Sequence, residues 1–168
     1  MIIYSIPGPW AGQLAIVPRP RGGDWLEDEL HALKSEGFDV VVSLLTGEES
    51  EELGLICEAG VSQSLGLDFL NLPIPDLNVP EPRNAAHALL SKLYDKLVAG
   101  KHVAIHCRQG IGRSGLVAAS LLVLAGIDPM TAFRKTSSAR GLPVPETDAQ
   151  RDWVMDFSRE VLEPVTKG

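Results

Sequence analysis

Short apolar runs alternate with amphipathic segments along most of this chain. The runs are rich in Val, Ile and Leu and predict strands at 2–6, 14–17, 39–45, 67–72 and 102–106. Between them, apolar positions recur at helical spacing and end at Gly or Pro, which predicts helices at 24–36, 48–59, 82–100, 116–127, 129–141 and from 145 onward. Asp24 and Asp128 are placed to cap two of these helices.

The order of these elements indicates an α/β fold. Strands separated by helices favour parallel pairing with right-handed crossovers, so we expect one domain over residues 1–168 with a mainly parallel central sheet flanked by helices. In such sheets, ligands bind beyond the carboxyl ends of the strands. The segments after residues 72 and 106 are therefore expected to open on the same edge.

Composition narrows the functional classes. The chain has 168 residues, 45% of them hydrophobic, and a net charge of −7, which argues against a nucleic-acid binder. The longest apolar run, 116–127, is too short to span a membrane. Two cysteines cannot build a disulfide framework, and the first residues carry no basic targeting segment, so we expect a cytoplasmic monomer without a cofactor.

The segment from His106 to Gly115 carries the chemistry. Cys107 and Arg113 are separated by five residues, Arg108, Gln109, Gly110, Ile111 and Gly112. Such a loop can turn successive backbone N–H groups inward as an anion-binding nest at the start of a helix. A guanidinium binds phosphate oxygens bidentately, and the same field favours a reactive Cys107 thiolate. The loop is predicted to bind a phosphate and attack it.

Other kinds of loop fit this segment less well. A structural Gly-rich turn with a buried thiol would need neither the arginine nor the cysteine. A nucleotide-binding loop needs a lysine where Arg113 stands, and a nucleophile elbow needs glycine where Leu116 stands. His102 and His106 share one face of a strand but have no third ligand near them in sequence, so no metal is expected.

A second loop supplies a carboxylic acid. Asp76 lies among Pro73, Pro75 and Pro80, after the strand at 67–72. An acid there can protonate the departing oxygen of a phosphate monoester. Asp68, Asp95 and Asp128 are explained instead by a turn, an exposed helix face and an N-cap. Because the chain is acidic overall, the phosphate must be attracted locally, and a basic mouth could be built from Arg108, Arg113, Arg134, Lys135 and Arg140. For Arg134 and Lys135 a solvated helix face is the favoured interpretation, whereas Arg140, beside a glycine turn, fits either interpretation.

The residues of the first loop resemble the HCxxGxxRS/T signature of the cysteine-dependent protein tyrosine phosphatases. The Pro-Ile-Pro-Asp-x-x-x-Pro segment, followed by a long helix, is similar to the acid loop of small dual-specificity phosphatases of the cyclin-dependent-kinase-associated type. The expected roles are Cys107 as nucleophile, Asp76 as general acid and then base, and Arg113 with the N–H groups of 108–113 as the phosphate clamp. Ser114 can donate to the thiolate, and His106 can orient the loop.

The last helix offers a weaker candidate. By the same resemblance, Gln150 near its start is expected to position the hydrolytic water, or else to be an exposed polar residue of the first turn. Glu146 is a further candidate nearby. Cys57 could trap an oxidised Cys107 as a disulfide, although its apolar surroundings favour a buried, inert thiol.

The expected substrate is a phosphorylated protein or peptide. Gln109, Gly110, Ile111 and Gly112 provide no lysine for additional phosphates, which favours a monophosphate ester. Phosphotyrosine, alone or together with phosphoserine and phosphothreonine, is the favoured substrate. A lipid phosphate, an RNA 5′-phosphate, a non-catalytic phosphate-recognition module and a rhodanese-like sulfur transferase remain the alternatives.

Overall fold

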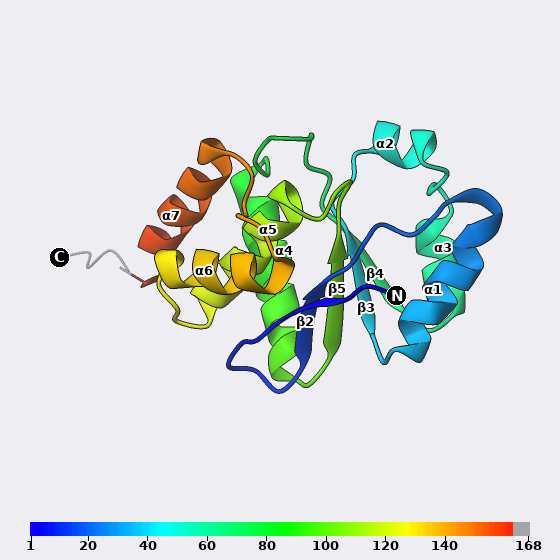
Figure 1. The fold of residues 1–168 in the computed structure, drawn as a ribbon, viewed down its shortest axis with the longest axis horizontal. Helices are drawn as coiled ribbons and strands as arrows, with labels where there is room; N and C mark the ends of the chain where they lie inside the picture. The colour runs from blue at the N-terminus through cyan, green and yellow to red at the C-terminus, as the bar shows by residue number, and fades with distance from the viewer. Residues whose placement is uncertain (163–168) are drawn as a thin grey trace.

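A five-stranded sheet forms the centre of the molecule. The computed structural model describes residues 1–162, and the strands lie in the order β1-β2-β5-β3-β4 (Figure 1). Their bounds are β1 Tyr4–Ile6, β2 Gln13–Ile16, β3 Val40–Ser43, β4 Asp68–Asn71 and β5 His102–His106. The four strands β2, β5, β3 and β4 pair in parallel, and β1 pairs antiparallel with β2 at one edge. The expected fold class, with its mainly parallel sheet, is confirmed.

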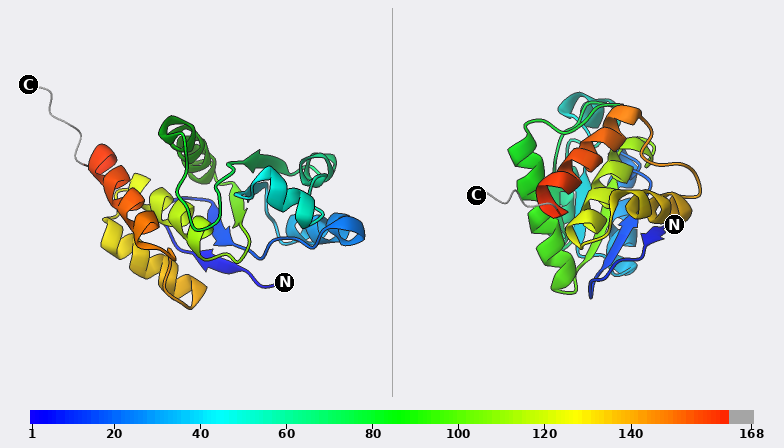
Figure 2. Two further views of the ribbon diagram at one scale, coloured as in Figure 1. Left: turned by 90° about the horizontal axis from the view of Figure 1, so that it is seen from above. Right: turned by 90° about the vertical axis from the view of Figure 1, so that its left-hand side faces the viewer.

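Helices cover both faces of this sheet. They are α1 Leu26–Ser35, α2 Gly47–Glu52, α3 Glu58–Ser64, α4 Arg83–Val98, α5 Gly112–Leu124, α6 Pro129–Arg140 and α7 Asp148–Leu162. A 3₁₀ turn, Gly23–Trp25, precedes α1. Seen from above, α4 to α7 lie on one side of the sheet and α1 and α3 on the other (Figure 2). None of the helices described is long and apolar enough to cross a membrane.

Alternate residues of the central strands point into two separate cores. Val42 and Ile105 belong to the larger core, which α4, α5 and α7 complete, whereas Val41 and Ala104 belong to the smaller core under α1 and α3. Because both faces are covered, the central strands consist almost entirely of apolar residues. α5 packs between the sheet and α7, and its residues from 113 to 123 are buried.

The segment after β3 differs most from expectation. The sequence predicts one helix over 48–59, but the structure has two short helices, α2 and α3, with Gly60 inside the second. The chain breaks at Gly54, whose φ of 69° lies in the left-handed region that glycine adopts without strain. Leu55 then turns into the smaller core. The break separates Glu49 on α2 from Glu58 on α3.

Three helix starts also differ from the prediction. Asp24 does not cap α1, because it lies inside the 3₁₀ turn and no side-chain cap bond forms there. α5 begins at Gly112 rather than 116, and α7 begins at Asp148 rather than 145. By contrast, Asp128 caps α6 as expected, since its side chain accepts from the N–H of Thr131. The earlier start of α5 brings Arg113 into the first helical turn.

Candidate active site

The phosphate loop joins the buried end of β5 to the first turn of α5. Cys107 is 3% exposed, and its Sγ accepts a hydrogen bond of 3.2 Å from the N–H of Gly110. The loop therefore curls back over the thiol, as the motif predicted. The carboxyl ends of the parallel strands form the upper edge of the sheet in Figure 1, and the loop lies on that edge with α2 and the loop after β4. The N–H groups at the start of α5 favour an anion there.

Arg113 lies at the centre of the site and is 1% exposed. Its Nη1 donates to Glu49 Oε1 at 2.6 Å and to the carbonyl of Ile74 at 2.7 Å. Its Nη2 donates to Glu49 Oε2 at 3.0 Å and lies 3.2 Å from Asp76 Oδ1. Burial disfavours the charged form, but the hydrogen bond to Glu49 and the charges of Cys107, Glu49 and Asp76 outweigh it and raise the pKa of Arg113.

Glu49 is a site residue that the sequence analysis missed. It sits in the first turn of α2, where it exchanges hydrogen bonds with Thr46 in a capping box. Its side chain is 13% exposed. Burial raises its pKa, but hydrogen bonds from Arg113 and from Thr46 prevail and lower the pKa below its ordinary value. The Thr-x-x-Glu pattern at 46–49 is visible in the sequence, but its contact with Arg113 is not.

Asp76 reaches the same guanidinium from an exposed loop. Its side chain is 58% exposed, in contrast to Ile74, which is fully buried and whose N–H donates to the carbonyl of Leu44 at 3.1 Å. Asp76 Oδ1 also accepts from the N–H of Leu77 at 3.0 Å. The acid loop and the phosphate loop therefore meet at Arg113, and Asp76 also has the local bond of a turn residue.

Gln150 connects three segments of the site. It is fully buried, so the interpretation as an exposed residue of the first helical turn is wrong. Its Oε1 accepts from the N–H groups of Glu146 and Thr147, and its Nε2 donates to the carbonyl of Asn78 in the acid loop, each at 3.1 Å. A Cβ on Gly112 would lie 2.9 Å from this amide, so a side chain at this position would displace the end of Gln150. Glu146 itself is exposed.

A buried acid lies behind the nucleophile. His106 is fully buried, and its Nε2 lies 2.6 Å from Oε2 of Glu58, which is 2% exposed. His106 Nδ1 and Ser114 Oγ are buried without a hydrogen-bond partner within residues 1–162. Sequence reasoning missed Glu58, because it follows an apolar stretch 48 residues before its partner and only the break after α2 turns it inward.

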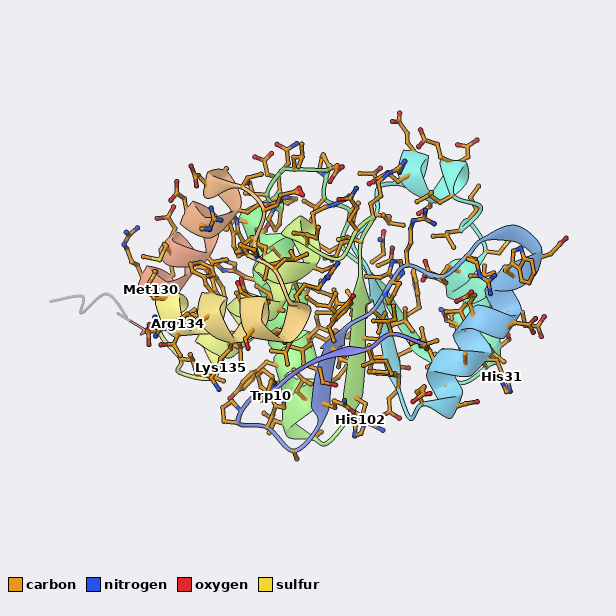
Figure 3. The ribbon with its side chains drawn as sticks, viewed as in Figure 1. Trp10, His31, His102, Met130, Arg134 and Lys135 are labelled. Atoms are coloured by element: carbon orange, nitrogen blue, oxygen red, sulfur yellow. The ribbon has the colours of Figure 1, made fainter. Side chains whose placement is uncertain are left out.

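The basic mouth is only partly as predicted. Arg140 donates to the carbonyls of Gly110 and Gln109 at 2.9 and 3.1 Å, and Arg108 lies 3.3 Å from Glu52. Arg134 and Lys135, by contrast, lie on α6 away from the upper edge (Figure 3) and line other pockets. The favoured interpretation of these two side chains as part of a solvated helix face agrees with the exposed Arg134 and the partly exposed Lys135, and only the last residue of α6, Arg140, reaches the loop. Arg19 and Arg21, which the sequence analysis missed, lie beside the loop instead.

The remaining candidates lie around this centre. Cys57 is exposed at the start of α3, so the prediction of a buried thiol is wrong, because the chain leaves the helix before this position. Within residues 1–162, no group of three or more His, Cys, Asp or Glu side chains is arranged to hold a metal ion.

Comparison with known proteins gives consistent results. The family model described as "Polymorphic toxin system, DSP-PTPase phosphatase" matches residues 17–127. A protein of Invertebrate iridescent virus 6, named as a tyrosine phosphatase, is 31% identical over 152 residues, which cover 88% of this chain and 53% of the viral protein. The rat cyclin-dependent kinase inhibitor 3 is 28% identical over 134 residues, covering 79% and 63%. The chain thus spans between half and two thirds of these relatives.

Two solved structures share the fold. A kinase-associated phosphatase with its catalytic cysteine replaced by serine is 21% identical, with a TM-score of 0.85 and coverage of 96% of both chains. The active form of Tk-PTP is 28% identical, with a TM-score of 0.72 and coverage of 92% and 94%. The architecture of the sheet and its helices is therefore shared over nearly the whole length of this chain.

Proposed function

The chain belongs to the dual-specificity phosphatase family of cysteine-dependent protein tyrosine phosphatases, and from that premise we propose that it hydrolyses phosphotyrosine, phosphoserine and phosphothreonine in proteins. The observation that carries the proposal is the convergence on Arg113. The guanidinium lies 3.2 Å from Asp76 Oδ1, and the loop that precedes it holds the Cys107 thiol at 3.2 Å from the N–H of Gly110. Nucleophile, phosphate clamp and acid therefore meet at one phosphoryl group.

The first chemical step transfers the phosphoryl group to Cys107. The thiolate attacks phosphorus, the S–P bond forms, and the P–O bond to the leaving group breaks. Asp76 gives its proton to the departing oxygen, which leaves as a neutral hydroxyl. Arg113 and the N–H groups of residues 108 to 113 hold the three equatorial oxygens while charge redistributes. Since Glu49 and Ile74 fix Nη1 of Arg113, the guanidinium is oriented before the substrate arrives.

The second step releases phosphate. The Asp76 carboxylate takes a proton from a water molecule, which attacks phosphorus as the S–P bond breaks and its electron pair returns to Cys107. Ser114 Oγ, buried without a protein partner among the residues described, is available to donate to the departing thiolate. Gln150 holds the acid loop through Asn78 and acts in this proposal as a positioning residue for the acid, and the second N–H of its Nε2 orients the water.

The proposed substrates are proteins, and the protein acts as one domain in a reducing compartment such as the cytoplasm. A free thiolate is required at Cys107, and both cysteines are free. The viral relative's name refers to tyrosine phosphatase activity, which supports phosphotyrosine as a substrate. Phosphotyrosine is longer than phosphoserine and phosphothreonine. Whether the protein accepts one or all three therefore depends on how far a phosphate must extend from the peptide backbone to reach Cys107.

The test is to trap the intermediate. Wild-type protein is mixed with a phosphotyrosine peptide, quenched in acid within milliseconds and analysed by mass spectrometry for a phosphate on the peptide that contains Cys107. Cys107→Ser should lose turnover by at least about 10³-fold while still binding the phosphopeptide. A panel of phosphoserine, phosphothreonine, phosphoinositide and RNA 5′-phosphate substrates then defines the class. Turnover by Cys107→Ser near the wild-type rate would rule out the mechanism.

A further inference from the structure

Arg140, the last residue of α6, is bonded to the backbone of the phosphate loop. Its Nε donates to the carbonyl of Gly110 at 2.9 Å, and its Nη2 donates to the carbonyl of Gln109 at 3.1 Å. It lies 30 residues after Gly110 in the chain, outside the loop motif. A cation thus holds two consecutive carbonyl oxygens of the loop, and the catalytic steps at Cys107 leave it without a role.

Each of these carbonyls belongs to a peptide unit whose N–H group points the opposite way. The bond between Gln109 and Gly110 is trans, and in a planar trans peptide the C=O and N–H bonds are antiparallel. The N–H of Gly110 donates to Sγ of Cys107 at 3.2 Å, and the carbonyl of the same unit accepts from Arg140. In the next unit the N–H of Ile111 likewise faces away from Arg140. Arg140 therefore holds the two units from the side opposite the thiol.

An aromatic ring holds the Arg140 guanidinium in place. The guanidinium carbon lies 4.3 Å over the ring of Tyr4 on β1, which packs against α6. A planar guanidinium can stack on a ring while its edge donates in fixed directions, so it can hold two carbonyls at once. No carboxylate of residues 1–162 lies within 4.0 Å of Arg140. Its charge is therefore directed at the loop carbonyls.

The backbone at Gly110 has a conformation that such a contact stabilises. Its φ is 70°, in the left-handed region that glycine adopts without strain. A Cβ here would lie 3.2 Å from Cγ2 of Ile16 and 3.7 Å from Nε of Arg140, so the loop passes closely between β2 and this side chain. A rotation of the 109–110 peptide would turn its carbonyl toward the thiol and break the bond to Arg140. Arg140 therefore favours the orientation in which the N–H group faces Cys107.

We propose that Arg140 is a positioning residue for the phosphatase reaction and holds two peptide units so that their N–H groups face the thiol and the phosphoryl group. The inference rests on the proposed function and concerns a residue that acts through the loop backbone. Hydrogen bonds in series polarise one another, so a carbonyl bonded to a cation makes the N–H of the same unit a stronger donor. Such donors matter most where charge develops on the equatorial oxygens. Loss of Arg140 should weaken transition-state binding more than phosphate binding.

The experiment compares a transition-state analogue with a ground-state ligand. Orthovanadate forms a five-coordinate adduct with a thiolate, which resembles the transferring phosphoryl group, whereas inorganic phosphate stays tetrahedral. In Arg140→Ala, calorimetric titration should give a Kd for vanadate raised about tenfold and a Kd for phosphate raised no more than about twofold. With para-nitrophenyl phosphate, kcat should fall about tenfold while KM stays nearly unchanged.

Matched variants separate orientation from charge. Arg140→Lys keeps the charge but loses the planar fork, so it should recover only part of the vanadate affinity. Tyr4→Leu, which removes the ring beneath the guanidinium, should weaken vanadate binding about threefold, and Tyr4→Phe, which keeps the ring, should match the wild type. Arg134→Ala, at an exposed position of the same helix, should leave both affinities unchanged.

The opposite results would overturn the role of Arg140. These are an unchanged vanadate affinity in Arg140→Ala, full recovery in Arg140→Lys, or equal losses for vanadate and phosphate, which would indicate direct contact with the anion. A purely structural role would lower the melting temperature and kcat but leave the Kd of the folded protein for vanadate unchanged. The proposed function fails separately, if the wild-type protein releases no phosphate from any ester, whatever its affinity for vanadate.

Discussion

The two loops that meet at Arg113 are held to very different degrees. In the phosphate loop, Cys107 and Arg113 are 3% and 1% exposed and follow a buried strand into a buried helix. In the acid loop, Asp76 and Leu77 are 58% and 54% exposed. The core thus holds the proposed phosphate-binding groups in place, as electrostatic stabilisation requires. The proposed general acid lies on a more exposed segment.

Three bonds compensate for this exposure of the acid loop. The N–H of Ile74 donates to Leu44, Arg113 donates to the carbonyl of Ile74, and Gln150 donates to the carbonyl of Asn78. One hydrogen bond thus attaches the acid loop to the segment after β3, a second attaches it to Arg113 at the start of α5, and a third attaches it to α7. Changes in the phosphate loop should therefore slow every ester, whereas changes in the acid loop should depend on the leaving group.

The largest effect is expected for Arg113→Lys. A lysine keeps the charge but cannot keep the bidentate pair with Glu49, the bond to Ile74 and a fork for phosphate at once. Turnover should fall by about 10³-fold for all esters. Steady-state kinetics with phenyl and para-nitrophenyl phosphate measure this. Arg134→Lys is the control, and near-normal rates in Arg113→Lys would mean that charge alone suffices at this position.

Asp76→Asn should slow the hydrolysis of different esters to different extents, depending on how basic the leaving group is. Hydrolysis of phenyl phosphate, whose leaving oxygen is basic, should slow by about 10²-fold, and an activated ester that departs unprotonated should slow far less. The matched control is Asn78→Ala, which alters the same loop without removing an acid. If Asp76 only caps the turn through the N–H of Leu77, both esters will slow equally and the melting temperature will fall.

A smaller effect is expected for Glu58→Gln, which tests the support behind the phosphate loop. Glu58 Oε2 lies 2.6 Å from Nε2 of His106, the residue directly before Cys107, so this contact fixes the end of β5 from which the phosphate loop starts. Without the contact the loop should hold the thiol less well, and the rate of Cys107 alkylation by iodoacetamide, followed by mass spectrometry in a Cys57→Ser background, should change severalfold. Glu27→Gln, on the exposed face of α1, should alkylate at the original rate. A Glu58→Gln variant with unchanged alkylation and turnover would reduce the pair to a packing role.

The smallest effect concerns stability at low pH. The pKa of Glu49 is lowered in the folded protein, so its stabilising contribution is present above pH 4.5, its ordinary value, and is lost as the pH falls through the lowered value. Glu49→Gln should therefore lose about 1 kcal/mol at neutral pH and should depend less on pH below 4.5. Melting temperatures across that range measure this, with the exposed Glu48→Gln as control. Parallel curves for wild type and Glu49→Gln would contradict the pairing.

The sequence predicted those parts of the site that are continuous along the chain. The phosphate loop needs its cysteine, glycines and arginine at fixed spacing, so Cys107, Gly110 and Arg113 could be assigned from the motif, and their geometry agrees. The sheet and the order of its elements followed from the apolar runs. Helix boundaries were less accurate, because local signals such as Asp24 and Pro145 competed with packing of the neighbouring segments.

Other parts of the site depend on contacts between distant segments. Glu49 and Glu58 lie 64 and 48 residues from their partners, and no periodicity indicates that an acid on α2 pairs with Arg113 or that one on α3 turns inward. The sequence favours a solvated face for Arg134 but leaves the place of Arg140 open, and the direction of α6 brings Arg140 to the phosphate loop.

The sequence by itself determined the fold class and the arrangement of Cys107 and Arg113 in one loop, because each depends on neighbouring residues or on apolar periodicity. Only the tertiary structure decided which carboxylates hold Arg113 and His106, how Gln150 joins the two loops, and which arginines lie beside the phosphate loop. The physical reason is that charges and hydrogen bonds act over a few ångströms in space. Their partners are therefore set by how the strands and helices pack, and not by position along the chain.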